Sequence, residues 1–171
     1  AYNDELTAYT WSTSVDKLFA ERDFRITDKN GDTIVIATSR WIYIDINRRR
    51  PVRITPKIMD RYESEPENRV FTEKITKTDI PDTDYIEIAY NILRRDVDHL
   101  GHMHNISYLD VAYDVMPEEY FNGPQFNFVS IEYRKELLKN DDVKTHFYKI
   151  DNGCIISLNT DKINSVITLK Y

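Results

Sequence analysis

The sequence contains a single cysteine, Cys154, among 171 residues, which excludes an internal disulfide and any cysteine-rich metal site. No run approaches the ~20 apolar residues that a membrane-spanning helix needs, and no basic-then-apolar leader opens the sequence. We therefore expect a cytoplasmic protein without a membrane span. Because the sequence opens at Ala1, not at a methionine, and inside a strand-like run, we also expect processing or truncation.

Positive charge is also in short supply. The 23 basic residues are outnumbered by 29 acidic ones, giving a net charge of −6. This balance argues against non-specific binding to nucleic acids or anionic membranes. Hydrophobic residues make up 41% and charged residues 30%, a composition typical of a globular protein.

Glycine and proline are scarce, at 4 and 6 residues, so the turn signals that remain are informative. Asn30-Gly31 separates the apolar runs 18–28 and 33–46, which predicts a β-hairpin. The run 33–46 has apolar residues on both faces, so we expect a strand that is covered on both sides. Two further turns are predicted by the same reasoning, at Asn152-Gly153 and, more weakly, at Asn164-Ser165.

Helical signals are few. Residues 105–116 place apolar side chains at three- and four-residue spacing, with Asn105 as the expected N-cap and Pro117 ending the pattern. Residues 56–62 predict a second, short helix. The polar stretch 63–83 reads as a linker between a first domain, residues 1–62, and a second, residues 84–171.

The order of predicted elements after the linker is one strand, one helix and several antiparallel strands, which is the order of a hotdog domain. Residues 95–109, RDVDHLGHMHNISYL, resemble the signature Asp-x-Asp-x-Asn-x-His-x-Asn-Asn-x-x-Tyr of acyl-acyl carrier protein (ACP) thioesterases. Residues 131–136, IEYRKE, resemble that family's Glu-Tyr-Arg-x-Glu segment. Matches to the N-terminal half of the family lie at Trp11, residues 23–26, residues 39–41 and residues 49–53.

This resemblance implies an α+β fold of two tandem hotdogs, each an antiparallel sheet wrapped around a central helix. The N-terminal hotdog is expected to be incomplete, with strands only. It also implies an enzyme of fatty acid biosynthesis that hydrolyses acyl-ACP and releases free fatty acid, without a metal or other cofactor. An acyl-coenzyme A thioesterase and a non-catalytic acyl-binding hotdog are the alternatives.

The same resemblance assigns a catalytic network to Asp98, His102 and Glu136, with Glu136 as the general base toward water. Leu100 stands where the family has an asparagine that orients this network, so we expect a reduced rate. The plant enzymes' cysteine falls on Leu137, which excludes a cysteine nucleophile at that position. Without the resemblance, a loop histidine, a solvated strand carboxylate and a loop-capping aspartate are the plainer interpretations of the three network residues.

Residues near the predicted start of the helix are suited to binding the thioester carbonyl oxygen. Backbone N–H groups there carry the positive end of the helix dipole and can polarise a thioester carbonyl. Gly101 has no side chain to obstruct its approach, so Gly101 and Asn105 are the substrate and oxyanion candidates. His99, His102 and His104 have a spacing possible for zinc, but no second shell is evident, and we expect no metal.

The remaining expectations concern partners. Arg49, Arg50 and Arg53 belong to the only concentrated positive charge, either a solvated turn or a docking site for the acidic carrier protein and its pantetheine phosphate. An incomplete first hotdog would expose the sheet face around Ile34 or Trp41. We therefore expect a homo-oligomer or another association through that half.

Overall fold

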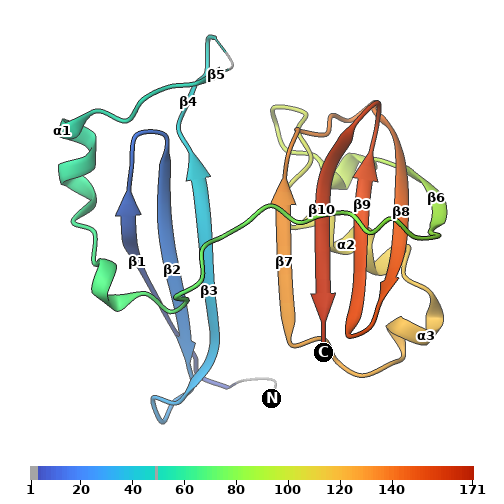
Figure 1. Ribbon diagram of the computed structural model, residues 1–171, viewed down its shortest axis with the longest axis horizontal. Helices are drawn as coiled ribbons and strands as arrows, with labels where there is room; N and C mark the ends of the chain where they lie inside the picture. Colours follow the sequence, from blue (N-terminus) through green and yellow to red (C-terminus); the bar gives the residue numbers. More distant parts are fainter. Residues whose placement is uncertain (1–3, 49) are drawn as a thin grey trace. The chain divides into compact units, whose positions relative to one another are not determined.

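Residues 4–48 and 50–171 are described by a computed structural model of the chain. Arg49 lies outside the described residues. The chain divides after Thr76 into two compact units, Ala1–Thr76 and Lys77–Tyr171, shown in Figure 1. Each unit is described by itself below.

The first unit is built on one antiparallel sheet in the order β1-β2-β3. The predicted hairpin at Asn30-Gly31 is confirmed, since it joins β2 to β3. The Asp28 carboxylate accepts the backbone N–H groups of Asn30 and Asp32, both at 2.9 Å, and Gly31 has the positive φ of 88° that this turn requires. The three strands span Thr7–Val15, Phe19–Thr27 and Thr33–Ile42.

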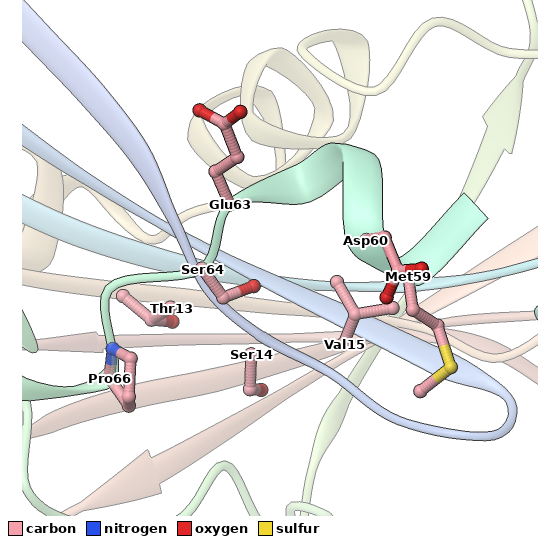
Figure 2. Close-up of a pocket in the computed structure, with 8 residues that line it drawn as sticks. All are labelled: Thr13, Ser14, Val15, Met59, Asp60, Glu63, Ser64 and Pro66. Atoms are coloured by element: carbon pink, nitrogen blue, oxygen red, sulfur yellow. The ribbon is translucent and has the colours of Figure 1, made fainter. Parts of the chain in front are cut away.

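After β3 the chain forms a two-stranded antiparallel ribbon, and residues 56–70 then pass back alongside β1. This return segment is held by hydrogen bonds to β1, among them the Glu65 N–H to the Ser12 carbonyl at 2.8 Å. An open hollow of about 410 Å³ lies between the two and is seen in Figure 2. The short elements are β4 (Ile44–Asp45), β5 (Arg50–Pro51), α1 (Pro56–Met59), η1 (Asp60–Tyr62) and η2 (Pro66–Asn68).

The prediction that the run 33–46 is covered on both sides is wrong. Ile34 and Val35 point to opposite faces of β3, yet they are 52% and 47% exposed. Trp41, near the end of the strand, is 56% exposed. Apolar side chains on both faces indicate a strand that can be packed against on both sides. The described residues of this chain provide no such packing for β3.

The second unit is a five-stranded antiparallel sheet in the order β6-β8-β9-β10-β7 (Figure 1). The predicted turn at Asn152-Gly153 is confirmed and joins β8 to β9. The strands are β6 (Ile86–Asn91), β7 (Phe128–Tyr133), β8 (Asp142–Ile150), β9 (Gly153–Asn159) and β10 (Ile163–Lys170). The helices are η3 (Arg94–Asp96), α2 (Ser107–Asp114) and α3 (Glu118–Phe121).

Helix α2 packs on one face of this sheet and forms the main core. Val111 and Ala112 are buried against the strands. Burial of apolar surface contributes roughly 25 cal/mol of stabilising free energy per Å² removed from water. The other sheet face carries a smaller cluster that Ile80, from the segment before β6, helps to cover. The sheet residues of the main core include Val143, Phe147, Ile156, Leu158, Ile167 and Leu169.

Two local predictions need correction. Helix α2 begins at Ser107, its N-cap is Ile106, and Asn105 lies in the preceding turn. The weaker turn predicted at Asn164-Ser165 is wrong, because both residues lie inside β10. The chain instead reverses just before this strand, at residues 160–162.

Among the helices of residues 4–48 and 50–171, none has the length and apolar character of a transmembrane helix.

Candidate active site

The site begins with a tight loop between η3 and α2. The Asp98 carboxylate accepts the backbone N–H of Leu100 at 2.8 Å and of His102 at 3.0 Å. The backbone closes the same loop, since the Asp98 N–H donates to the His102 carbonyl at 2.8 Å. Gly101, with φ of 82°, supplies the left-handed residue that this reversal needs. The sequence thus folds into a rigid loop that presents His102.

A second segment is attached to this loop by backbone pairing. The Met103 N–H donates to the Leu137 carbonyl at 2.8 Å, and the Lys139 N–H donates to the Gly101 carbonyl at 3.2 Å. Leu137 is fully buried in the core beneath α2. Glu136 immediately precedes Leu137. It is therefore held next to the loop, because the backbone of its segment pairs with the loop and the Leu137 side chain is buried in the core.

This pairing brings His102 and Glu136 together. The His102 Nε2 atom lies 2.9 Å from Glu136 Oε2, within hydrogen-bond distance. The His102 side chain is 35% exposed and the Glu136 side chain 56% exposed. More than half of the Glu136 side chain faces solvent, as in the solvated-carboxylate interpretation. The pair is therefore assembled and open to water.

Asp98 occupies a different position from the other two network candidates. Its carboxylate lies under the loop and is bound to backbone N–H groups, as in the loop-capping interpretation. The hydrogen bond from the His102 backbone, followed by that from Leu100, holds the pKa of Asp98 below its usual value. Its contribution to loop order is therefore complete above the ordinary pKa of 3.8 and is lost as the pH falls.

Two tyrosines outside the predicted network lie at the start of α2 and in contact with the turn before it. The Tyr133 hydroxyl donates to the Asn105 carbonyl at 2.9 Å, and the Tyr108 ring meets the Tyr133 ring edge-on at 5.0 Å between centroids. Burial raises the pKa of Tyr108 to about 12, and its hydroxyl also receives a hydrogen bond from the Leu137 backbone. Tyr108 belongs to the motif at residues 95–109 and Tyr133 to the motif at residues 131–136, and these motifs are the sequence feature that could have indicated them.

The remaining loop candidates are accessible. The Asn105 side chain is exposed, and its carbonyl is the one that binds Tyr133. A Cβ built on Gly101 would meet no atom within 4 Å, so its backbone faces open space. Leu100 is 66% exposed, which leaves an apolar side chain in water at the loop tip.

The arginine cluster lies in the first unit, where Arg48 lies 3.9 Å from the Asp45 carboxylate and the docking candidates Arg50 and Arg53 are described. Both are exposed, Arg50 on β5 and Arg53 just after it. The predicted docking residue Arg49 lies outside the described residues. Across residues 4–48 and 50–171, no three His, Cys, Asp or Glu side chains gather as a metal site would require.

Comparison with known families places matches on both units. The model of the acyl-ACP thioesterase N-terminal domain matches residues 1–62. The model of the acyl-ACP thioesterase C-terminal domain matches residues 80–170, more than half of the chain.

Curated relatives come from plants. The chain is 27% identical over 154 residues to oleoyl-acyl carrier protein thioesterase 2, chloroplastic, of Arabidopsis thaliana, a match that covers 84% of this chain and 42% of the relative. It is 25% identical to the corresponding thioesterase of Coriandrum sativum, covering 84% of this chain and 41% of that one. The chain therefore spans about two fifths of the length of the curated relatives it matches.

Solved structures share the fold. An acyl-ACP thioesterase from Bacteroides thetaiotaomicron superposes with a TM-score of 0.82 at 20% identity, over 98% of this chain and 68% of that one. The 12:0-ACP thioesterase from Umbellularia californica superposes with a TM-score of 0.78 at 15% identity, over 99% and 68% of the two chains. These superpositions confirm the predicted α+β hotdog architecture.

Proposed function

The chain belongs to the acyl-ACP thioesterase family, and from that premise we propose that it hydrolyses the thioester of acyl-ACP to a free fatty acid. The observation that carries the proposal is the 2.9 Å contact between His102 and Glu136. A histidine and a carboxylate within hydrogen-bond reach, open to solvent, can together hold and deprotonate a water molecule. The names of the plant relatives, all acyl carrier protein thioesterases, support the same substrate class.

In the proposed reaction, Glu136 accepts a proton from water while the water oxygen bonds to the thioester carbonyl carbon. The carbon–sulfur bond then breaks, and Glu136 returns the proton to the departing thiolate of the pantetheine arm, which leaves as the thiol. His102 donates a hydrogen bond that keeps the carboxylate oriented during both transfers. Asp98 contributes indirectly, because it fixes the loop from which His102 projects.

The carbonyl oxygen gains negative charge in this step and needs donors. We place it beside Asn105, in the turn that leads into α2, where the helix dipole is positive. Gly101 lies in the preceding loop and flanks this position, and its own N–H already donates to the Asp98 carbonyl at 3.0 Å. The open space at Gly101 supports an approach from that side. Arg50 and Arg53 are proposed to bind the carrier protein, since exposed guanidinium groups suit carboxylates and phosphate.

The test is release of free thiol from an acyl-ACP substrate by the full chain, compared with the same acyl group on coenzyme A. We expect a higher kcat/KM on the carrier protein, and loss of about 10²–10⁴-fold in Glu136→Gln and His102→Ala. Matched controls are Glu119→Gln on α3 and His99→Ala at the loop tip, both on exposed side chains. Equal rates for wild type and both site variants would contradict the proposal.

One observation favours a second candidate, a non-catalytic acyl-binding protein. The Glu136 side chain is 56% exposed, and a general base works best where water is largely excluded. Saturable binding of acyl-ACP without thiol release would favour this candidate. A preference for coenzyme A over the carrier protein would instead favour an acyl-coenzyme A thioesterase.

We also propose that the chain associates with a second copy of itself through β3. This strand lies at the edge of its sheet and carries exposed apolar residues such as Ile34 and Trp41. Unpaired edges with apolar side chains favour pairing with another strand. Sedimentation of wild type and Trp41→Lys tests this, because a monomeric wild type at high concentration would remove the support.

A further inference from the structure

A buried asparagine, Asn164, lies behind the carboxylate of the proposed site. It is fully buried in β10 at a bulge, since the pairing of β10 with β9 shifts register between Ile163 and Ser165. A bulge leaves one residue out of the regular ladder and re-aims its side chain. Here the bulged residue is Asn164, and it faces the segment that leads to Glu136.

Asn164 binds three consecutive residues of that segment. Its backbone carbonyl accepts the N–H of Arg134 at 2.8 Å and of Lys135 at 3.0 Å. Its side-chain amide donates from Nδ2 to the Glu136 carbonyl at 3.2 Å. The ladder of β7 with β10 ends at Tyr133, so these bonds take over where regular pairing stops.

The other end of the same amide is fixed as well. Asn164 Oδ1 accepts the backbone N–H of Thr160 at 2.9 Å, and the Thr160 hydroxyl lies 2.9 Å from both Asn164 Oδ1 and Asp161 Oδ1. The backbone bond orients the amide, so that its N–H groups point toward Glu136. A buried amide satisfied on both ends holds its partner's backbone in one position, and losing one partner leaves a costly unpaired group.

We propose that Asn164 is a positioning residue for the hydrolytic site, acting through the backbone of Glu136. The inference rests on the proposed function. Asn164 holds the Glu136 carbonyl and the next residue, Leu137, is buried in the core, so the Glu136 backbone is fixed where its side chain reaches His102. Without the amide, the carboxylate samples positions out of reach of the imidazole.

The test compares Asn164→Asp, which keeps the size and the acceptor but removes the Nδ2 donor, with Asn164→Ser, which adds no charge. Asn122→Ser is the matched control, because it also removes a side-chain amide, from an exposed residue whose Nδ2 binds Glu118 and not the Glu136 segment. For both Asn164 variants we expect kcat on acyl-ACP to fall about 10- to 100-fold with KM within about 2-fold, since a misplaced catalytic group affects the chemical step. Asn122→Ser should keep kcat within about 2-fold of wild type.

A second readout does not depend on turnover. The NMR signal of the His102 ring should shift in Glu136→Gln, and the Asn164 variants should shift it in the same direction. If wild type proves inactive on acyl-ACP, this signal still tests the positioning role by itself. Folded Asn164 variants with the kcat and the His102 signal of wild type would overturn the proposal, and so would an equal loss of kcat in Asn122→Ser. If Asn164→Asp does not fold, Asn164→Ser decides.

Discussion

Substituting Leu137 with alanine tests how the second unit supports its site. Leu137 is fully buried among the core residues beneath α2, whereas its neighbour Leu138 is 43% exposed. Truncation of a buried leucine costs about 2–5 kcal/mol, combining lost transfer free energy with the cavity left behind. Since domains have about 5–15 kcal/mol of stability in total, we expect Leu137→Ala to fold but to be markedly less stable.

The measurement is urea unfolding followed by far-UV circular dichroism. With a slope of about 1–3 kcal/mol per molar urea, Leu137→Ala should lower the midpoint by on the order of 2 M. Leu138→Ala is the matched control, and its side chain has little burial to lose. Equal shifts for the two variants would refute the reasoning that Leu137 anchors the Glu136 segment.

Three further predictions concern the loop, the helix and the charge cluster. Leu100→Asn should raise kcat on acyl-ACP several-fold, because the exposed apolar side chain is replaced by an amide beside the His102 loop; an unchanged or lower kcat would count against it. Burial raises the pKa of Tyr108 from 10.0 to about 12. The contribution of the neutral Tyr108 to stability is therefore complete below pH 10 and is lost as the pH rises toward 12. The urea midpoint of wild type should fall between pH 10 and pH 12, and that of Tyr108→Phe should fall less. Arg50→Glu with Arg53→Glu should raise KM for acyl-ACP, more at low salt than at high salt, and a KM independent of salt would remove the docking proposal.

Local patterns predicted the parts of the fold that are decided locally. The hairpin at Asn30-Gly31 follows from the turn chemistry of two adjacent residues, and the helix over α2 follows from spacing within its own segment. The position of Asn164 at a β-bulge could not be predicted from local patterns, because the bulge depends on the register of β10 against β9. The exposure of β3 likewise depends on what covers the strand, which its own residues do not determine.

For the site, the sequence selected His102 and Glu136 through motifs, and the structure places their side chains in contact. Their proximity depends on backbone pairing between two segments that are distant in the chain. The sequence left open whether Glu136 is solvated and whether Asp98 caps the loop, and the structure shows both. Both depend on how the loop folds and on what the chain leaves uncovered.

The central claim is that Glu136, held against His102, activates water for attack on a thioester. Single-turnover hydrolysis of acyl-ACP in water labelled with oxygen-18 tests it most directly. The account predicts that fatty acid from the first turnover carries the label in wild type and that Glu136→Gln yields almost none in the same time. Unlabelled fatty acid in the first turnover would mean that a protein oxygen attacked the carbonyl, and rapid labelled product from Glu136→Gln would mean that another group activates the water.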